Sequence, residues 1–341
     1  MTAATPPEPK PAATVVLIRD GAVGVEAFLM RRDNAMAFAG GMTVFPGGGV
    51  DSRDMHADVP WLGPDVDWWA HQFGVTPELA SALVCAAARE TFEECGVLFA
   101  GTSENSIVED AAVYHQARKD LSDKTLSFAE FLQREGLQLR ADLLRPWANW
   151  ITPEAEPRRY DTFFFVAALP AGQDADGNNT EAVASGWQTP AAAIAAFTER
   201  RSFLLPPTWS QLDAVSSAGA SVAEVLGVAR SIAPIMPILT EQDGRWVVQF
   251  DDVDRYEAAR QGAVEIPEVT GRSCHDRARI RRGAHRARAS RHRHHRVVAA
   301  AHQHLDPADV SRTGPGRRRG ERTRRHQGCH RLRRTRDFLR R

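Results

Sequence analysis

Three glutamates stand at helical spacing in the segment Arg-Glu-Thr-Phe-Glu-Glu-Cys-Gly, residues 89–96. Positions i, i+3 and i+4 share one face of an α-helix, so Glu90, Glu93 and Glu94 would crowd their carboxylates on one turn. Carboxylates this close repel one another, and a divalent cation turns that repulsion into binding. The pattern predicts a site for Mg²⁺ or Mn²⁺, hard cations that prefer oxygen ligands, with a solvated acidic helix face as the alternative.

Capping residues predict where this helix begins and ends. Thr76 can accept a hydrogen bond from the first turn, and Pro77 suits the first helical position. Gly96 can end the helix in a left-handed conformation. Arg89 lies four residues before Glu93, where its guanidinium can hold that carboxylate in place. We therefore expect the helix to start at Pro77 and to stop at Gly96.

A glycine-rich turn precedes this helix. The segment Val44-Phe-Pro-Gly-Gly-Gly-Val50 is typical of a strand that runs into a turn where the backbone can approach a ligand closely. Together with the acidic helix it resembles the Nudix box, which reads G, five residues, E, seven residues, R-E-U-x-E-E-x-G-U, with U an apolar residue. The residues that fit the pattern are Gly48, Arg89, Glu90, Glu93, Glu94, Gly96 and Val97.

Two departures distinguish this box from the common pattern. Asp54 stands where the pattern has Glu, and 34 residues separate it from Arg89 where the pattern has seven, an insertion of 27 residues. Thr91 also occupies a position that is usually apolar. The interruption resembles one branch of the family, that of nucleoside diphosphate-linked moiety X motif nineteen, some of whose members are coenzyme A diphosphatases. Further matches to that branch, which extend the resemblance to about residues 13–250, are Trp147-x-x-Trp150-x-Thr152-Pro153, Arg158–Phe164, Glu181 with Trp187-x-x-Pro190, and Leu205–Thr208.

The resemblance implies metal-dependent hydrolysis of a phosphoanhydride bond in a nucleoside diphosphate linked to another moiety, with coenzyme A or acyl-coenzyme A as candidate substrates. Glu90, Glu93 and Glu94 would ligate Mg²⁺ or Mn²⁺. Arg89 would orient a box carboxylate, and Glu181 is the candidate for a later general base. The candidate substrate contacts are Arg32, Gly47, Gly48, Arg158 and Arg159. A structural or solvent-exposed role is the alternative for Glu181 and the arginines.

Hydrophobic patterns elsewhere predict an α/β fold. Strands are expected at residues 13–20, 23–32, 38–45, 147–151, 161–169 and 245–250, and helices near residues 190–198 and 207–217. This order describes an α/β/α sandwich around a mixed β-sheet, which is also the fold that the Nudix resemblance implies. The Nudix domain would span residues 13–270 after a disordered N-terminus at residues 1–12.

Two insertions are expected within the domain. Helical spacing at residues 104–121 and 127–144 predicts a helical insert at about residues 101–145. The insertion within the box, residues 55–75, is tied at both ends to box residues. We therefore expect the segment Met55–Gly74 beside the active site, where it would help to select the substrate.

Charge divides the chain into two parts. The formal net charge is zero, but residues 272–341 contain 23 arginines and five acidic residues, a net charge of +18, which leaves −18 for residues 1–271. The tail at residues 271–341, rich in Arg and His, has too little apolar surface to fold alone and is predicted to be disordered. It would bind nucleic acid only nonspecifically. Alternatives are a working nucleic-acid arm on a noncatalytic, ligand-sensing Nudix scaffold, and the product of a shifted reading frame.

Cysteine spacing and hydropathy bear on the location of the protein. The four cysteines show no paired spacing, which predicts a reducing compartment and no zinc site. No apolar run approaches the length of a membrane span. We therefore expect a cytoplasmic protein whose partner is a small nucleotide-containing molecule, with no membrane partner. Self-association as a homodimer is left open.

Overall fold

Two long strands begin the fold. In the computed structural model, β1 (Lys10–Gly21) and β2 (Gly24–Arg32) pair antiparallel around a turn of Ala22 and Val23. The structure describes residues 5–33, 39–55, 59–177, 182–242 and 245–261. Contacts divide the chain into residues 1–277 and 278–341, and all described residues belong to the first unit.

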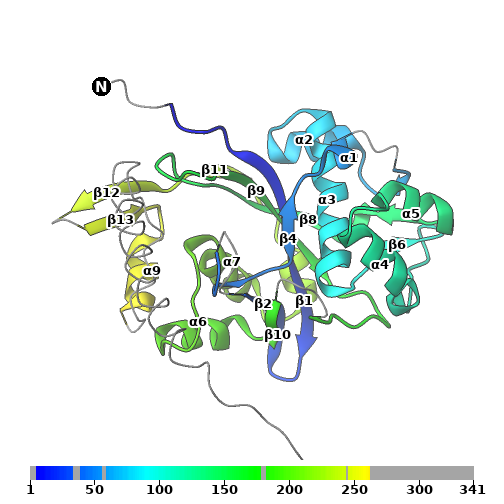
Figure 1. Cartoon of the computed structure of the whole chain (residues 1–341). Coiled ribbons are helices and arrows are strands. Elements are labelled where there is room, and N and C mark those ends of the chain that lie inside the picture. Colours follow the sequence, from blue (N-terminus) through cyan, green and yellow to red (C-terminus); the bar gives the residue numbers. More distant parts are fainter. Residues whose placement is uncertain (1–4, 34–38, 56–58, 178–181, 243–244, 262–341) are drawn as a thin grey trace, which may run out of the picture. The chain divides into compact units, whose positions relative to one another are not determined.

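The main sheet of the described chain is mixed and has eight strands (Figure 1). Its order is β10-β2-β1-β9-β8-β11, with β3 paired to β2 and β4 paired to β1. β1 runs parallel to β9, and β8 runs parallel to β11, whereas the other neighbours are antiparallel. Its other strands are β3 (Thr43–Val44), β4 (Gly47–Gly49), β8 (Leu144–Ile151), β9 (Tyr160–Ala168), β10 (Ala182–Gln188) and β11 (Pro234–Ile235).

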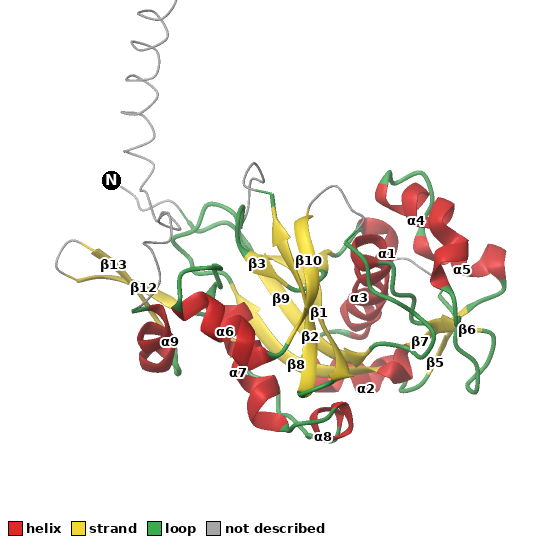
Figure 2. Ribbon diagram, turned by 90° about the horizontal axis from the view of Figure 1, so that it is seen from below, coloured by secondary structure: helices red, strands yellow, loops and turns green. Residues whose placement is uncertain are grey.

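Helices cover both faces of this sheet (Figure 2). One face carries α2 (Val66–Phe73) and α3 (Pro77–Cys95), and the other carries α6 (Pro190–Thr198), α7 (Pro206–Ala218) and α9 (Val253–Arg260). Side chains of a strand alternate between faces, so Val15 and Leu17 of β1 enter the core under α3, whereas Val16 enters the opposite core. The predicted α/β/α sandwich is confirmed.

The box helix α3 has the predicted bounds. Thr76 accepts a hydrogen bond from the Leu79 amide at 3.3 Å, and Gly96 ends the helix with a φ of 72°. Both signals are local in sequence, so they could be identified without knowing the tertiary structure. Thr91 is fully buried at its usually apolar position, and its hydroxyl donates to the Ala87 carbonyl at 2.7 Å. This internal hydrogen bond satisfies the hydroxyl where no water can reach it.

The predicted insert after the box helix contains helices, but they are shorter than expected. α4 (His115–Ser122) and α5 (Phe128–Glu135) are accompanied by 3-10 helices at Ala111–Tyr114 and Ala141–Leu143. A three-stranded sheet of β5 (Trp61–Leu62), β7 (Gln138–Arg140) and β6 (Ala100–Gly101) joins this insert to the insertion in the box. The sequence did not predict this sheet, because its strands are too short to show a period.

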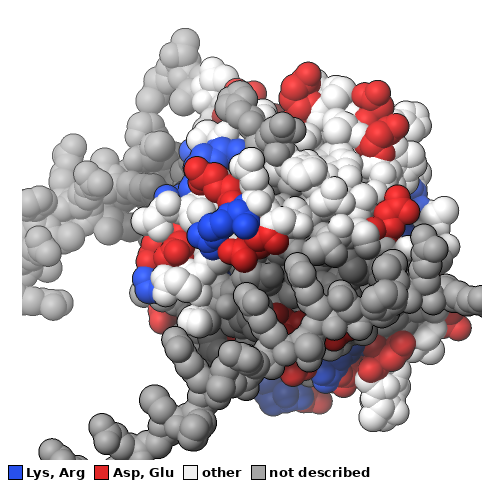
Figure 3. Space-filling view, turned by 90° about the vertical axis from the view of Figure 1, so that its right-hand side faces the viewer, with Lys and Arg blue, Asp and Glu red and all other residues white. Residues whose placement is uncertain are grey.

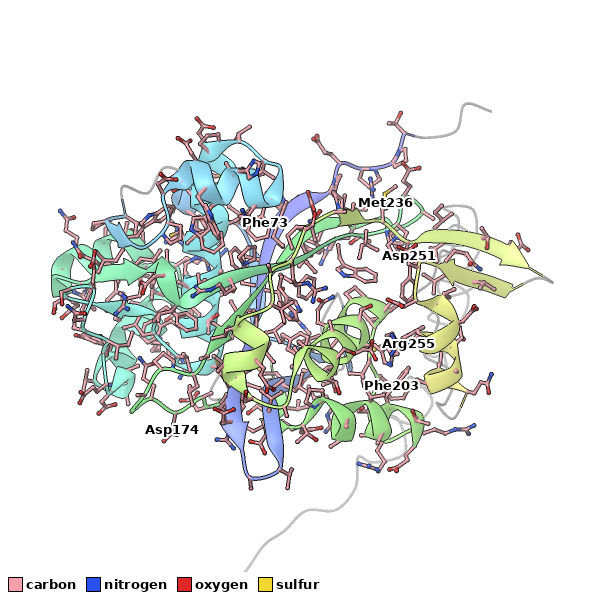
Figure 4. The ribbon with its side chains drawn as sticks, turned by 180° about the vertical axis from the view of Figure 1, so that it is seen from behind. Phe73, Asp174, Phe203, Met236, Asp251 and Arg255 are labelled. Atoms are coloured by element: carbon pink, nitrogen blue, oxygen red, sulfur yellow. The ribbon has the colours of Figure 1, made fainter. Side chains whose placement is uncertain are left out.

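The insertion within the box contributes to the core. Trp69 of α2 is fully buried with its ring centroid 5.6 Å from that of Phe165, and the ring of Phe73 lies 5.2 Å from that of Phe163 (Figure 4). The segment Met55–Gly74 therefore has a structural function that its sequence did not reveal. Its expected role in substrate selection stays a prediction.

Several strand boundaries differ from the expectation, among them the start of β8, which lies at Leu144 rather than at residue 147. β1 begins at Lys10 rather than at residue 13, because the Lys10 amide donates to the Arg159 carbonyl at 3.0 Å and the Pro11 carbonyl accepts from Val50 at 3.0 Å. The strand expected over residues 38–45 is reduced to β3, since only Thr43 and Val44 pair with β2. The prediction of a disordered N-terminus through residue 12 is therefore wrong at residues 10–12.

An ion pair joins two helices of the second face. Arg255 of α9 forms an ion pair with Asp213 of α7, with an N–O distance of 2.5 Å, which fixes α9 to the helical layer (Figure 4). The expected tail at residues 271–341 lies outside the described residues. None of the helices in the described residues is long and apolar enough to span a membrane. The other elements are α1 (Ser52–Met55), α8 (Val222–Leu226), β12 (Ile238–Gln242) and β13 (Arg245–Gln249).

Candidate active site

The glycine-rich strand β4 lies directly against the acidic turn of α3. The Gly47 amide donates to a carboxylate oxygen of Glu94 at 2.6 Å. A Cβ atom at Gly48 would lie 2.6 Å from the carboxyl group of Glu90, closer than real Cβ contacts allow. Glycine at residue 48 thus lets the strand approach the helix, which brings both predicted box segments together.

Arg89 forms the centre of the site. Its Nε and Nη2 donate to both oxygens of Asp54 at 3.1 and 2.8 Å, and its Nη1 donates to Glu90 at 2.9 Å and to Glu93 at 3.0 Å. The Gly49 carbonyl accepts a further bond from Nη2 at 3.1 Å. Its side chain is 8% exposed, so these interactions occur largely out of water. Arg89 thus contacts three carboxylates, and its expected orienting role in a reaction stays a prediction.

Asp54 binds the arginine rather than joining the three glutamates. It is buried, and its carboxylate forms the planar, two-bond pair with Arg89 that a guanidinium favours. Its Oδ2 also accepts at 2.9 Å from the amide of Asp51, the residue just before α1. Asp54 therefore fixes Arg89, and Arg89 in turn orients Glu90 and Glu93.

Burial shifts the pKa values of the charged groups in the site. Burial raises the pKa of Glu90 to about 7, against the opposing effect of the Arg89 charge. Burial also raises the pKa of Glu93, again opposed by Arg89. For Arg89, burial disfavours the charged form, but the charge of Glu90 and the hydrogen bonds to Asp54 raise its pKa overall. The positive charge of Arg89 therefore offsets only part of the effect of burial on the pKa values of Glu90 and Glu93.

This partial compensation fits a divalent cation. The donor set consists of carboxylate oxygens, which Mg²⁺ and Mn²⁺ prefer, and a bound cation would stabilise the anionic forms of Glu90 and Glu93. Within the described residues no three metal-ligating groups converge on one point. Glu90 and Glu93 instead direct oxygens to Arg89, and Glu94 directs one to Gly47. The assignment of all three glutamates as ligands stays a prediction.

A second arginine beside the box was missed by the sequence analysis. Arg53 forms an ion pair with Asp51, whose pKa is lowered mainly by the hydrogen bond from the Arg53 side chain. Its Nη1 donates to the carbonyls of Lys124 and Leu126 at 3.3 and 3.1 Å. Arg53 thus joins α1 to the turn between α4 and α5. No spacing rule links residues so far apart in sequence, so no signal could have found this contact.

The candidate substrate arginines differ in their surroundings. Arg159 is buried and donates to the carbonyls of Thr152 and Pro7 and to the sulfur of Met236, at 3.0, 2.9 and 3.4 Å (Figure 4). These contacts favour the structural alternative for Arg159. Arg158 is exposed. Arg32 ends β2, where strand alternation from Met30 places it on the same face of the sheet as α3.

The predicted general base cannot be placed. Glu181 lies outside the described residues, which resume at Ala182. The site therefore consists of Arg89, Glu90, Glu93 and Glu94 with the backbone of β4, and Glu181 stays a prediction.

A mixed sheet between helical layers, with a glycine-rich strand against an arginine-bound acidic helix, defines a Nudix fold with its box. Comparison with known proteins agrees, because residues 70–215 match the family model described as the NUDT19 Nudix domain. A Nudix hydrolase from Alicyclobacillus acidocaldarius shares the fold with a TM-score of 0.53 at 24% identity, over 66% of this chain and 98% of that chain. The chain therefore has the Nudix fold, and its residues 70–215 are similar to the NUDT19 Nudix domain.

Two curated relatives carry the name of acyl-coenzyme A diphosphatases. The acyl-coenzyme A diphosphatase NUDT19 of Xenopus laevis is 26% identical over 226 residues, which is 55% of this chain and 58% of the relative. The human acyl-coenzyme A diphosphatase NUDT19 is 27% identical over 251 residues, or 61% of this chain and 63% of the relative. The match thus spans less than two thirds of the length of either relative.

Proposed function

We propose that this protein is a divalent-metal-dependent Nudix hydrolase that cleaves the diphosphate bond of a nucleotide linked to another moiety, with coenzyme A or acyl-coenzyme A as the substrate. The observation that supports it best is the binding of Asp54, Glu90 and Glu93 by Arg89 beside the glycine strand. The likeness to acyl-coenzyme A diphosphatases supports the choice of substrate.

Each group of the site has a part in this reaction. Divalent cations, Mg²⁺ or Mn²⁺, would supply charge neutralisation at the diphosphate and a lower pKa for attacking water. Glu90, Glu93 and Glu94 would hold them. Arg89 orients the first two carboxylates, and the Gly47 amide orients the third. Preorganised groups of this kind need no rearrangement when charge develops in the transition state.

The alternative, a noncatalytic ligand-sensing or nucleic-acid-binding protein, has less support. A protein that only binds its ligand does not need three carboxylates on one buried turn, where burial raises the pKa of both Glu90 and Glu93. Acidic and basic side chains are also interspersed on the described face that carries the helical insert (Figure 3). An extended basic surface for nucleic acid is not seen among the described residues in that view.

The first experiment is a substrate screen with the full chain. Coenzyme A, acyl-coenzyme A, NADH, ADP-ribose and dinucleoside polyphosphates are each incubated with Mg²⁺ or Mn²⁺, and the phosphomonoester products are separated. Hydrolysis adds one water across the phosphoanhydride, so ¹⁸O-labelled water should place the label in one product only. We expect the coenzyme A compounds to have the highest kcat/KM. No metal-dependent hydrolysis of any compound would overturn the proposed function.

Substitution of the glutamates tests the site itself. We expect Glu93→Gln and Glu94→Gln each to lower kcat at least about a hundredfold, because each removes an anionic ligand while keeping the shape of the side chain. Glu78→Gln is the matched control, since Glu78 is exposed in the first turn of the same helix. Circular dichroism should show all three variants folded. Normal turnover of both box variants would exclude these carboxylates from the mechanism.

The cysteines support a cytoplasmic location as part of the proposal. Cys85 and Cys95 both lie on α3, buried and free. Free thiols in a buried helix are compatible with a reducing compartment. Cell fractionation against a cytoplasmic marker would test this location.

A further inference from the structure

The last turn of α3 is held by residues from outside the box. The final carbonyls of any helix lack partners within the helix and need others. The Glu93 carbonyl accepts from Nε of Arg118 at 3.0 Å, and the Cys95 carbonyl accepts from the Asp176 amide at 2.9 Å. The Glu93 carbonyl belongs to the peptide group between Glu93 and Glu94. A displacement of that peptide would therefore move both candidate ligands.

Arg118 reaches this position from α4 of the helical insert. Its Nη1 forms an ion pair with Asp176 at 2.8 Å, and its side chain is 13% exposed. A Cβ atom at Gly96 would lie 2.8 Å from the same nitrogen, so the glycine that ends α3 also leaves room for the guanidinium. One side chain thus bridges the carboxylate turn and the loop after β9.

The loop after β9 is itself fixed to the chain that follows α3. The Gln173 side chain is buried, accepts from the Leu98 amide at 2.8 Å, and donates to the Leu98 carbonyl at 2.9 Å and the Val108 carbonyl at 2.6 Å. Asp176 therefore follows a residue that is hydrogen-bonded to the chain after α3, and its carboxylate pairs with Arg118. Three separate segments meet at the end of the box helix.

We propose that Arg118 is a positioning residue for the hydrolysis, holding the Glu93–Glu94 peptide in register with the loop after β9. The proposal rests on the proposed function, because it assigns Arg118 an effect on that reaction. Its Nη2 is buried and has no hydrogen-bond partner among the described residues. A misplacement of about 1 Å in reacting groups can cost about a hundredfold in rate, so a shift of the Glu93–Glu94 peptide should lower kcat.

The insert offers a matched control for the loss of a buried arginine. Arg140 is 10% exposed, forms an ion pair with Asp142 at 2.7 Å, and donates to the Ser106 carbonyl. Its side chain therefore combines a carboxylate and a carbonyl partner as Arg118 does, but neither partner belongs to α3. Arg140→Gln should lose similar stability without moving the carboxylate turn.

The test compares Arg118→Gln, Arg118→Lys and Arg140→Gln in the full chain by kcat, KM, thermal midpoint and Mn²⁺ affinity from electron paramagnetic resonance. We expect Arg118→Gln to lower kcat at least about tenfold with KM changed less than about threefold, and to weaken Mn²⁺ binding about threefold or more. Arg118→Lys should have a higher kcat than Arg118→Gln, because its ammonium can reach one of the two acceptors, the Glu93 carbonyl or the Asp176 carboxylate, but not both. Arg140→Gln should lose less than about twofold in kcat.

The partner carboxylate supplies a second, independent variant. Asp176→Asn keeps the size of the side chain and the backbone contact to Cys95 but removes the charge, so it should lower kcat in the same direction as Arg118→Gln. The double variant should lose no more than the stronger single variant, because both act through one contact. If Arg118→Gln does not fold, the Asp176→Asn variant tests the positioning role in its place.

Four outcomes are decisive. Equal losses of thermal midpoint in Arg118→Gln and Arg140→Gln, with kcat and Mn²⁺ affinity of the former unchanged, would overturn the positioning role. Additive effects of Arg118→Gln and Asp176→Asn would also overturn it. If the wild-type chain binds Mn²⁺ but hydrolyses no diphosphate, the proposed function fails and with it the effect of Arg118 on that reaction, and the Mn²⁺ affinities of the variants then show separately whether Arg118 positions the carboxylate turn. If the wild-type chain binds no Mn²⁺, both proposals fail.

Discussion

Two opposing effects determine the pKa of Glu90. Burial raises its pKa to about 7, and the adjacent Arg89 charge opposes the shift without cancelling it. A carboxyl with a raised pKa binds a proton in the folded state between about pH 4.5 and 7, where the unfolded chain has released it. The folded state binds more protons over that window, so its contribution to stability is present at low pH and is lost as the pH rises.

The stability of the metal-free protein should therefore respond to pH through Glu90. Relative to Glu90→Gln, the wild-type chain should lose on the order of 2 kcal/mol of unfolding free energy between pH 5 and pH 8, because only the wild type must ionise a buried group. Denaturant unfolding in the presence of EDTA at both pH values measures this difference. The same difference between the two proteins at both pH values would show that the ionisation of Glu90 is not penalised.

Gly48 shows the steric requirement of the site at a single position. Gly48→Ala would place a methyl carbon 2.6 Å from the Glu90 carboxyl, which must then move from its place beside Arg89. We expect kcat to fall at least about tenfold. The control is Gly49→Ala, whose new Cβ would meet no atom within 4 Å, and it should change kcat much less. Equal activities in steady-state assays would show that the carboxyl adjusts without cost.

At the scale of elements, α2 places one of two adjacent tryptophans in the core and the other at the surface. Trp69 is fully buried, whereas Trp68 is 37% exposed. Trp69→Ala should lower the unfolding free energy by about 3–5 kcal/mol, because it empties a core position between α2 and β9. Trp68→Ala should lower it by no more than about 1 kcal/mol. Urea unfolding of the two variants measures both values, and similar losses would contradict the assignment of α2 to the core.

The same helix shows what the sequence could and could not predict. Asp65 accepts from the Trp68 amide at 2.8 Å and Gly74 ends the helix with a φ of 65°, so local capping signals for α2 were present in the sequence. Which of two adjacent tryptophans enters the core depends on how α2 sits on the sheet, and no local signal determines that. The box helix was predictable because its capping residues and its box residues lie within one continuous segment.

The site follows the same division between local and distant contacts. Arg89 lies four residues before Glu93, so helical spacing predicted that contact, whereas the contact between Arg89 and Glu90 was not predicted. Arg118 and Asp176 meet α3 from segments that no periodicity connects, and their contact appears only in three dimensions. Family motifs also named Arg159 as a substrate residue, although its donors are directed to the protein itself.

At the scale of the whole molecule, charge and core are separated along the chain. The hydrophobic residues of the two described cores lie between Ala13 and Ala259, whereas the arginine-rich sequence, with a net charge of +18, begins at residue 272. A nonspecific attraction to polyanions is expected from such a charge in any case. Binding at low salt therefore cannot show whether residues 271–341 contribute to the reaction. Truncation of the chain before these residues tests it.

A chain ending at Thr270 should keep its fold and its hydrolysis, because truncation there removes no residue of the described cores or of the site. We expect kcat/KM within about twofold of the full chain and a thermal midpoint within about 2 °C. Binding to DNA or RNA should lose its steep salt dependence, since each arginine that neutralises a phosphate adds to the slope. Loss of hydrolysis without unfolding would instead make residues 271–341 part of the catalytic unit, and sequence-selective binding near physiological salt by the full chain would make them a working nucleic-acid arm.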